Sequence, residues 1–71
     1  MTIGEERVRV KFNPSANGDV DTIKQATAHL IDLCEVQKSK DARLAALAQT
    51  AYEEAAMWAV KAATAEPKNV P

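Results

Sequence analysis

Hydrophobic and polar positions in residues 41–65 repeat with the period of a helix. This stretch contains eleven alanines and one tryptophan, but no glycine or proline. Small and apolar residues recur at alternating spacings of four and three, which is typical of a helix that packs along one face. We call this face the alanine seam, and it consists of Leu44, Ala48, Ala51, Ala55, Trp58, Ala62 and Ala65. Ala45 is expected on the outer face.

Residues 19–38 predict a second amphipathic helix. Its apolar positions follow the same three-and-four spacing, and they are Val20, Ile23, Thr27, Leu30 and Cys34, with Ile31 broadening the stripe. Gly18 or Asp19 is expected to cap its beginning, and Ser39 or Asp41 to cap the next helix. Because the connection is only a few residues long, the two helices should be antiparallel neighbours. Pro67 should end the helix over residues 41–65, and residues 67–71 should form a disordered tail.

Residues 7–12 alternate between basic and apolar side chains. A period of two is typical of a strand with one apolar and one basic face, and the alternating residues are Arg7, Val8, Arg9, Val10, Lys11 and Phe12. No second strand is indicated, so the segment should lie as an extended arm over the helices or pair with the same arm of another chain. Residues 1–6 are expected to be frayed.

These elements predict an all-α fold with one domain. Residues 1–18 would form the extended arm and a turn, and residues 19–66 an antiparallel two-helix hairpin. A core of 71 residues is small, and such domains usually need disulfides, a metal or oligomerisation. Cys34 is the only cysteine, which excludes an internal disulfide. The alanine seam also requires partner helices, so we predict a homo-oligomer of at least four chains.

Charge and hydropathy exclude several classes of partner. The formal net charge is −1, which argues against a nucleic acid polymer because such proteins normally carry a basic footprint. No apolar run approaches the length of a membrane span, and the N-terminus lacks the apolar core of a signal peptide. A single thiol on an apolar face favours a reducing compartment. We therefore expect a cytoplasmic protein with no membrane partner.

The first candidate site is the basic arm, with Arg9, Lys11, Phe12 and Asn13. An aromatic ring can stack on a base while cations meet phosphates and the amide binds a polar edge. The alternative is an edge strand whose charges prevent aggregation. Lys24 could meet a phosphate near the beginning of its helix, or it could be a surface lysine whose stem packs on apolar neighbours.

A second candidate site flanks the alanine seam. A mixed stripe runs along the same helix at spacings of three and four, and it consists of Leu47, Thr50, Glu54, Met57, Lys61 and Thr64. Thr50, Glu54 and Lys61 would suit a pocket between subunits, where polar groups need partners, although a half-solvated flank would look the same. No nucleophile or metal cluster accompanies these residues, so we predict no catalytic residue, no metal and no cofactor.

Several segments resemble a known family. They are Asn13-Pro14-Ser15, Ile23-Lys24, Leu30-Ile31-Asp32 and, above all, residues 47–64. In the last segment, Thr50, Met57 and Lys61-Ala62 follow a Thr–(x)6–Met–(x)3–Lys/Arg–Ala pattern. Over about residues 8–67 the chain is similar to the phage helical-hairpin nucleotide sponges that counter the CBASS and Thoeris defence systems.

This resemblance implies a fold, an assembly and a ligand. Family members are antiparallel helical hairpins that form homo-oligomers, commonly hexamers. They bind cyclic di- or trinucleotides, or cyclic ADP-ribose-type signals, without cleaving them, in a pocket between protomers. The resemblance places Phe12 where an aromatic residue stacks on a base and Lys24 where a lysine meets phosphate. Phe12 replaces the tyrosine expected there, and the segment between the two residues is shorter.

Three hypotheses follow from the sequence. The first is a phage-type immune-evasion sponge that acts in the host cytoplasm and sequesters a cyclic nucleotide signal. The second is a structural or regulatory helical oligomer with no small-molecule ligand. The third is an enzyme subunit.

Overall fold

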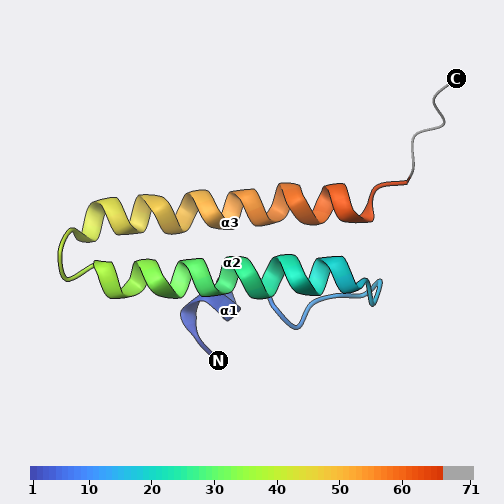
Figure 1. Cartoon of the computed structure of the whole chain (residues 1–71), viewed down its shortest axis with the longest axis horizontal. Coiled ribbons are helices and arrows are strands. Elements are labelled where there is room, and N and C mark those ends of the chain that lie inside the picture. The colour runs from blue at the N-terminus through green and yellow to red at the C-terminus, as the bar shows by residue number, and fades with distance from the viewer. Residues whose placement is uncertain (67–71) are drawn as a thin grey trace, which may run out of the picture.

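A computed structural model describes residues 1–66, which form three helices. Helix α1 spans Ile3–Arg7, α2 spans Gly18–Gln37, and α3 spans Ala42–Thr64. Helices α2 and α3 run antiparallel, and α1 lies beside α2 (Figure 1). The predicted all-α hairpin is confirmed, and both long helices begin within one residue and end within two residues of their predicted positions. The predicted tail, residues 67–71, lies outside the described residues.

Side-chain caps set the helix boundaries. The carboxylate of Asp41 accepts a hydrogen bond from the Leu44 amide at 2.9 Å, as predicted for one of two candidates. Helix α2 is capped by Asn17, whose side chain accepts from the amides of Asp19 and Val20. Neither predicted cap of α2 is used, because an amide oxygen placed before the first turn satisfies two amides that would otherwise lack partners.

The predicted strand over residues 7–12 is wrong, and residues 3–7 are helical rather than frayed. A reciprocal pair of hydrogen bonds between Thr2 and Glu5 begins α1, forming a capping box. Residues 1–66 contain no strand. Val8 and Val10 are both buried, but Arg9 between them has φ 54°, so this segment forms a turn and is not extended.

The core lies where residues 1–12, which we call the N-terminal segment, cross the hairpin. Val8 and Val10 pack with Ala28 and Ile31 of α2 and with Ala56 of α3, and Tyr52 borders the cluster. Helix α2 is therefore covered on two sides, by α3 and by the N-terminal segment. Its buried positions are Val20, Lys24, Ala28 and Ile31. Val20 and Ile31 belong to the predicted stripe, whereas Lys24 and Ala28 do not. Leu30, which was expected to be buried, is exposed.

Helix α3 packs on α2 through a face different from the predicted one. Ala45, Gln49 and Ala56 are buried, whereas most of the alanine seam is exposed on the chain. The expectation that Ala45 faces outward is wrong, since it lies in the hairpin interface. The exposed seam still offers a surface to partner chains, but partner chains remain a prediction.

A buried glutamine links the two long helices. Gln49 is 0% exposed, and its Nε2 donates to the Ile31 carbonyl at 3.1 Å and to the Glu35 carboxylate at 2.9 Å. The hydrogen bonds from Gln49 and Lys38 hold the pKa of Glu35 below its usual value. This polar contact fixes how α3 is positioned along α2, since a shift of either helix would leave the amide without its acceptors.

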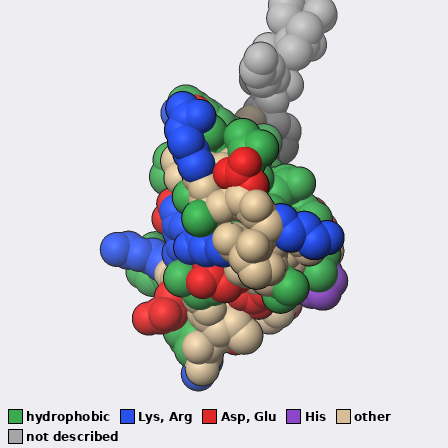
Figure 2. All heavy atoms as spheres, turned by 90° about the vertical axis from the view of Figure 1, so that its left-hand side faces the viewer, with side chains coloured by type: hydrophobic (Ala, Val, Ile, Leu, Met, Phe, Trp, Pro, Cys, Tyr) green, Lys and Arg blue, Asp and Glu red, His purple; other side chains and the backbone are tan. Residues whose placement is uncertain are grey.

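The surface charges are mixed in sign. From the end of the hairpin that carries the connection between α2 and α3, basic, acidic and hydrophobic side chains are interspersed (Figure 2). No helix of residues 1–66 combines the length and apolar character that crossing a bilayer requires.

The close approach of α1 to α2 depends on Gly4. Its amide donates to Asp32 Oδ1 at 2.7 Å, and an added Cβ would overlap the Ala28 carbonyl. We expect Gly4→Ala to lower the free energy of unfolding by about 1–3 kcal/mol, because α1 must move off α2. Gly18→Ala is the matched control, because its Cβ would meet nothing within 4 Å. Urea denaturation measures both, and equal losses would contradict this account of α1 docking.

Candidate functional site

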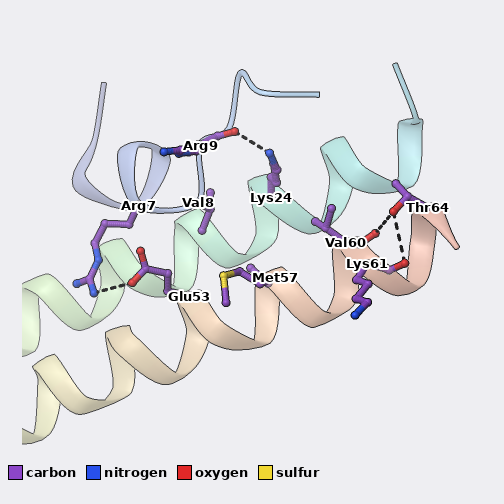
Figure 3. Close-up of a pocket in the computed structure, with 10 residues that line it drawn as sticks. Arg7, Val8, Arg9, Lys24, Glu53, Met57, Val60, Lys61 and Thr64 are labelled. Carbon is purple, nitrogen blue, oxygen red and sulfur yellow. Dashed lines mark hydrogen bonds and ion pairs between the residues drawn. The ribbon is translucent and has the colours of Figure 1, made fainter. Parts of the chain in front are cut away.

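A groove lies between the N-terminal segment and α3. It has a volume of about 620 Å³, within the range typical of small-molecule sites. Its lining comes from all three helices and from the turn after α1 (Figure 3). The lining residues are Arg7, Val8, Arg9, Lys24, Glu53, Ala56, Met57, Val60, Lys61 and Thr64.

Helix α3 forms one wall with a row of chemically different side chains. Glu53, Met57, Lys61 and Thr64 follow one another at spacings of four, four and three, which places them on one face. The backbone distance from Glu53 to Lys61 is about 12 Å, at about 1.5 Å per residue. A carboxylate, a thioether, an ammonium and a hydroxyl thus succeed one another along the groove.

The N-terminal segment forms the facing wall. Arg7 and Glu53 point toward each other across the groove (Figure 3), with Arg7 Nη2 donating to Glu53 Oε2 at 3.0 Å. Val8 is buried, and the exposed Arg9 follows it. The φ of 54° at Arg9 costs about 1–2 kcal/mol for a residue with a Cβ. That conformation is kept because the contacts on either side of Arg9 determine the path of the chain.

Lys24 is a buried lysine, not a residue on the surface of α2. It is 7% exposed, and its Nζ donates to the carbonyl oxygens of Arg9, at 2.9 Å, and Phe12. The Phe12 ring centroid lies 5.4 Å from the same nitrogen. Burial lowers the pKa of Lys24, and the nearby Arg9 charge lowers it further. The ammonium therefore ties the N-terminal segment to α2 and also lines the groove.

The remaining arm residues predicted to bind a ligand lie elsewhere. Lys11 and Phe12 line a shallower hollow on the other side of Arg9, and Phe12 is 60% exposed. The Asn13 side chain closes the turn before α2, accepting from the Asn17 amide at 3.2 Å and donating to the Asn17 carbonyl at 2.8 Å. Phe12 is open to a ligand, whereas Asn13 already has partners within the chain.

Of the mixed stripe on α3, too, only part lies in the groove. Lys61 lies in the groove, but Thr50 and Glu54 are exposed outside it. Glu54 accepts a hydrogen bond at 3.5 Å from the indole of Trp58, which also has Lys61 Nζ 5.5 Å from its ring. Of the eight predicted ligand residues, the groove therefore brings together Arg9, Lys24 and Lys61.

Sequence reasoning missed Arg7 and Glu53 as members of this groove. Glu53, Met57 and Lys61 follow one another at four-residue spacing, and this signal could have selected Glu53 in place of Glu54. Arg7 gave no such signal, because its position depends on the unpredicted α1. The described residues contain no cluster of three or more side chains suited to holding a metal ion.

The described residues form a small antiparallel helical hairpin with a groove between its N-terminal segment and α3. The chain belongs to the Acb2/Tad1 hairpin-domain family, whose model matches residues 3–64. This family is known for anti-defence sponges of cyclic nucleotides, which confirms the resemblance drawn from the sequence. No curated protein and no solved structure matches the chain.

The role of Lys24 in docking the N-terminal segment is open to a direct test. We expect Lys24→Met to lower the free energy of unfolding by about 1–3 kcal/mol, because two partly buried carbonyls lose their donor. Hydrogen exchange at the amides of Val10 and Phe12 should become faster. Lys11→Met, at an exposed position, should change stability by less than about 0.5 kcal/mol. Similar stabilities for the two variants would show that Lys24 does not fasten the segment.

Proposed function

We propose that this protein binds a cyclic nucleotide signal in the groove and holds it without cleaving it. The observation that carries the proposal is the local charge of the lining. The lining contains four cations, Arg7, Arg9, Lys24 and Lys61, and one carboxylate, Glu53, in a chain whose net charge is −1. Positive charge concentrated in a partly apolar groove attracts an anionic ligand more strongly than the same charges spread over the surface.

The apolar part of the lining suits the rings of a nucleotide. Val8, Ala56 and Val60 line the groove, and Met57 is 63% exposed there. A thioether makes favourable contacts with aromatic rings, so a base could rest on Met57 while its phosphate meets Lys61 or Arg9. Phe12 would add a stacking surface in the neighbouring hollow, as the family resemblance implies. Tight binding of this kind lowers the free concentration of the signal without chemistry.

The proposal includes assembly from several copies. Leu44, Ala51, Ala55 and Trp58 are exposed along α3, with Trp58 59% exposed. A row of apolar side chains on one helix is suited to another helix of the same kind. We place α3 of a second copy there, in a closed homo-oligomer for which the resemblance favours a hexamer. The protein would act in the cytoplasm of the host cell, where its ligand is made.

Ligand retention tests the function. The purified protein is incubated with a panel of cyclic di- and trinucleotides and cyclic ADP-ribose, then desalted and denatured. We expect one of these compounds to be recovered intact in a stoichiometric amount. Lys61→Ala should weaken its binding by about tenfold to a hundredfold, as for a lost charge-assisted hydrogen bond. Lys40→Ala, in the connection between α2 and α3, is the control.

The outcomes of this test separate the hypotheses. A converted compound would mean an enzyme. If the protein assembles but retains none of the compounds, the structural oligomer is favoured. The exposed apolar row on α3 also supports that hypothesis.

Assembly is tested by overfilling the exposed seam. Ala55→Leu should weaken association by an amount equivalent to about 1–3 kcal/mol if helices pack closely there. It should leave the isolated hairpin folded, because Ala55 is exposed on the chain. Ala45→Leu should instead destabilise the hairpin itself, since Ala45 is buried against α2. Sedimentation together with circular dichroism distinguishes the two effects, and a folded monomer for the unmodified protein would exclude the proposed assembly.

A further inference from the structure

Glu53 is the one acidic side chain among the described residues that line the groove. Its ion pair with Arg7 joins side chains that are 27% and 37% exposed, and pairs so accessible to water contribute little to stability. Stability alone therefore gives no reason to place a carboxylate where an anionic ligand would be repelled. A carboxylate at this position has a clear use if it accepts hydrogen bonds from the ligand.

The structure fixes the direction of this carboxylate. Arg7 binds Oε2 from the facing wall (Figure 3), and Arg7 itself follows the docked Gly4 in α1. No residue among 1–66 donates a hydrogen bond to Glu53 Oε1. An ionised carboxylate has about four acceptor positions, so the pair with Arg7 leaves room for a second partner. Glu53 thus presents acceptors, and no donor, to the groove.

Glu53 also stands at the correct place along α3 to contact a base. Met57, one turn further on, offers an exposed apolar surface, and Lys61 follows after another turn. A base that rests on Met57 with its phosphate at Lys61 would have its polar edge near Glu53. The distance of about 12 Å along the helix from Glu53 to Lys61 matches the scale of one nucleotide.

We propose that Glu53 makes the groove selective for guanine, by accepting hydrogen bonds from N1–H and the exocyclic N2 amino group of the base. This inference rests on the proposed function and adds a specificity-determining residue to it. Guanine presents two adjacent donors on this edge, which a carboxylate with two acceptors complements. Adenine presents an acceptor at N1 beside its N6 donor, so its N1 lone pair would face the carboxylate.

The test compares cyclic di-GMP with cyclic di-AMP by calorimetry on the unmodified full chain and on Glu53→Gln. The unmodified protein should prefer cyclic di-GMP by about tenfold to a hundredfold, as expected for hydrogen bonds to a charged group. A carboxamide has no charge and a single acceptor oxygen in place of two, so it serves the two guanine donors less well, whereas its amino group can donate to adenine N1. Glu53→Gln should therefore weaken cyclic di-GMP binding more than cyclic di-AMP binding and reduce the preference for guanine.

Glu66→Gln is the matched control, because it removes the same charge at an exposed position outside the groove lining. It should keep the preference of the unmodified protein. If Glu53→Gln weakens both ligands equally, Glu53 serves only the structure, and the inference is wrong while the proposed function stands. A preference of the unmodified protein for cyclic di-AMP would overturn the inference in the same way. If neither these dinucleotides nor any compound of the larger panel binds, the proposed function itself fails.

Discussion

The close contact between α1 and α2 at Gly4 determines where the N-terminal segment can lie. The backbone of Gly4 approaches the Ala28 carbonyl so closely that no side chain fits between them, and its amide is held by Asp32. From this point the chain continues to Val8 and Val10, which complete the core over both long helices. Without that contact the hairpin would lose one wall of its groove, because the facing residues follow directly after α1.

A buried polar group then fixes the position of this wall. Lys24 holds two carbonyls of the segment from within α2, whereas the ion pair between Arg7 and Glu53 is partly exposed and adds little to stability. Leaving a buried donor or acceptor without a partner is costly, so such contacts tolerate little displacement. In this chain the lysine that the family resemblance assigns to phosphate binding also has a structural task. A ligand that drew the Lys24 ammonium toward its phosphate would have to compete with the carbonyls of Arg9 and Phe12.

The candidate site combines residues that are close together in the sequence with residues that are far from them in the sequence. The row from Glu53 to Thr64 lies on one helix, and its common face follows from helical geometry alone. Arg7 and Arg9 reach the same groove only because α1 folds back on α2 and the chain turns at Arg9. The charge excess of the groove therefore depends on a tertiary contact, and sequence spacing could not have assigned Arg7 and Glu53 to one site.

The sequence by itself determined the two long helices, their antiparallel connection and the family. Helical periodicity, the Asp41 cap and the short connection are local properties, and local rules describe them well. For the N-terminal segment, local rules did not predict the structure. Thr2 and Glu5 have the spacing of a capping box, a signal that went unrecognised, and the alternation over residues 7–12 predicted a strand that does not form. Tertiary structure decided that Lys24 lies inside and that α3 turns Ala45 toward α2. These outcomes depend on which surfaces meet, because burial is set by the neighbours a residue acquires when the elements pack together, not by its spacing along the chain.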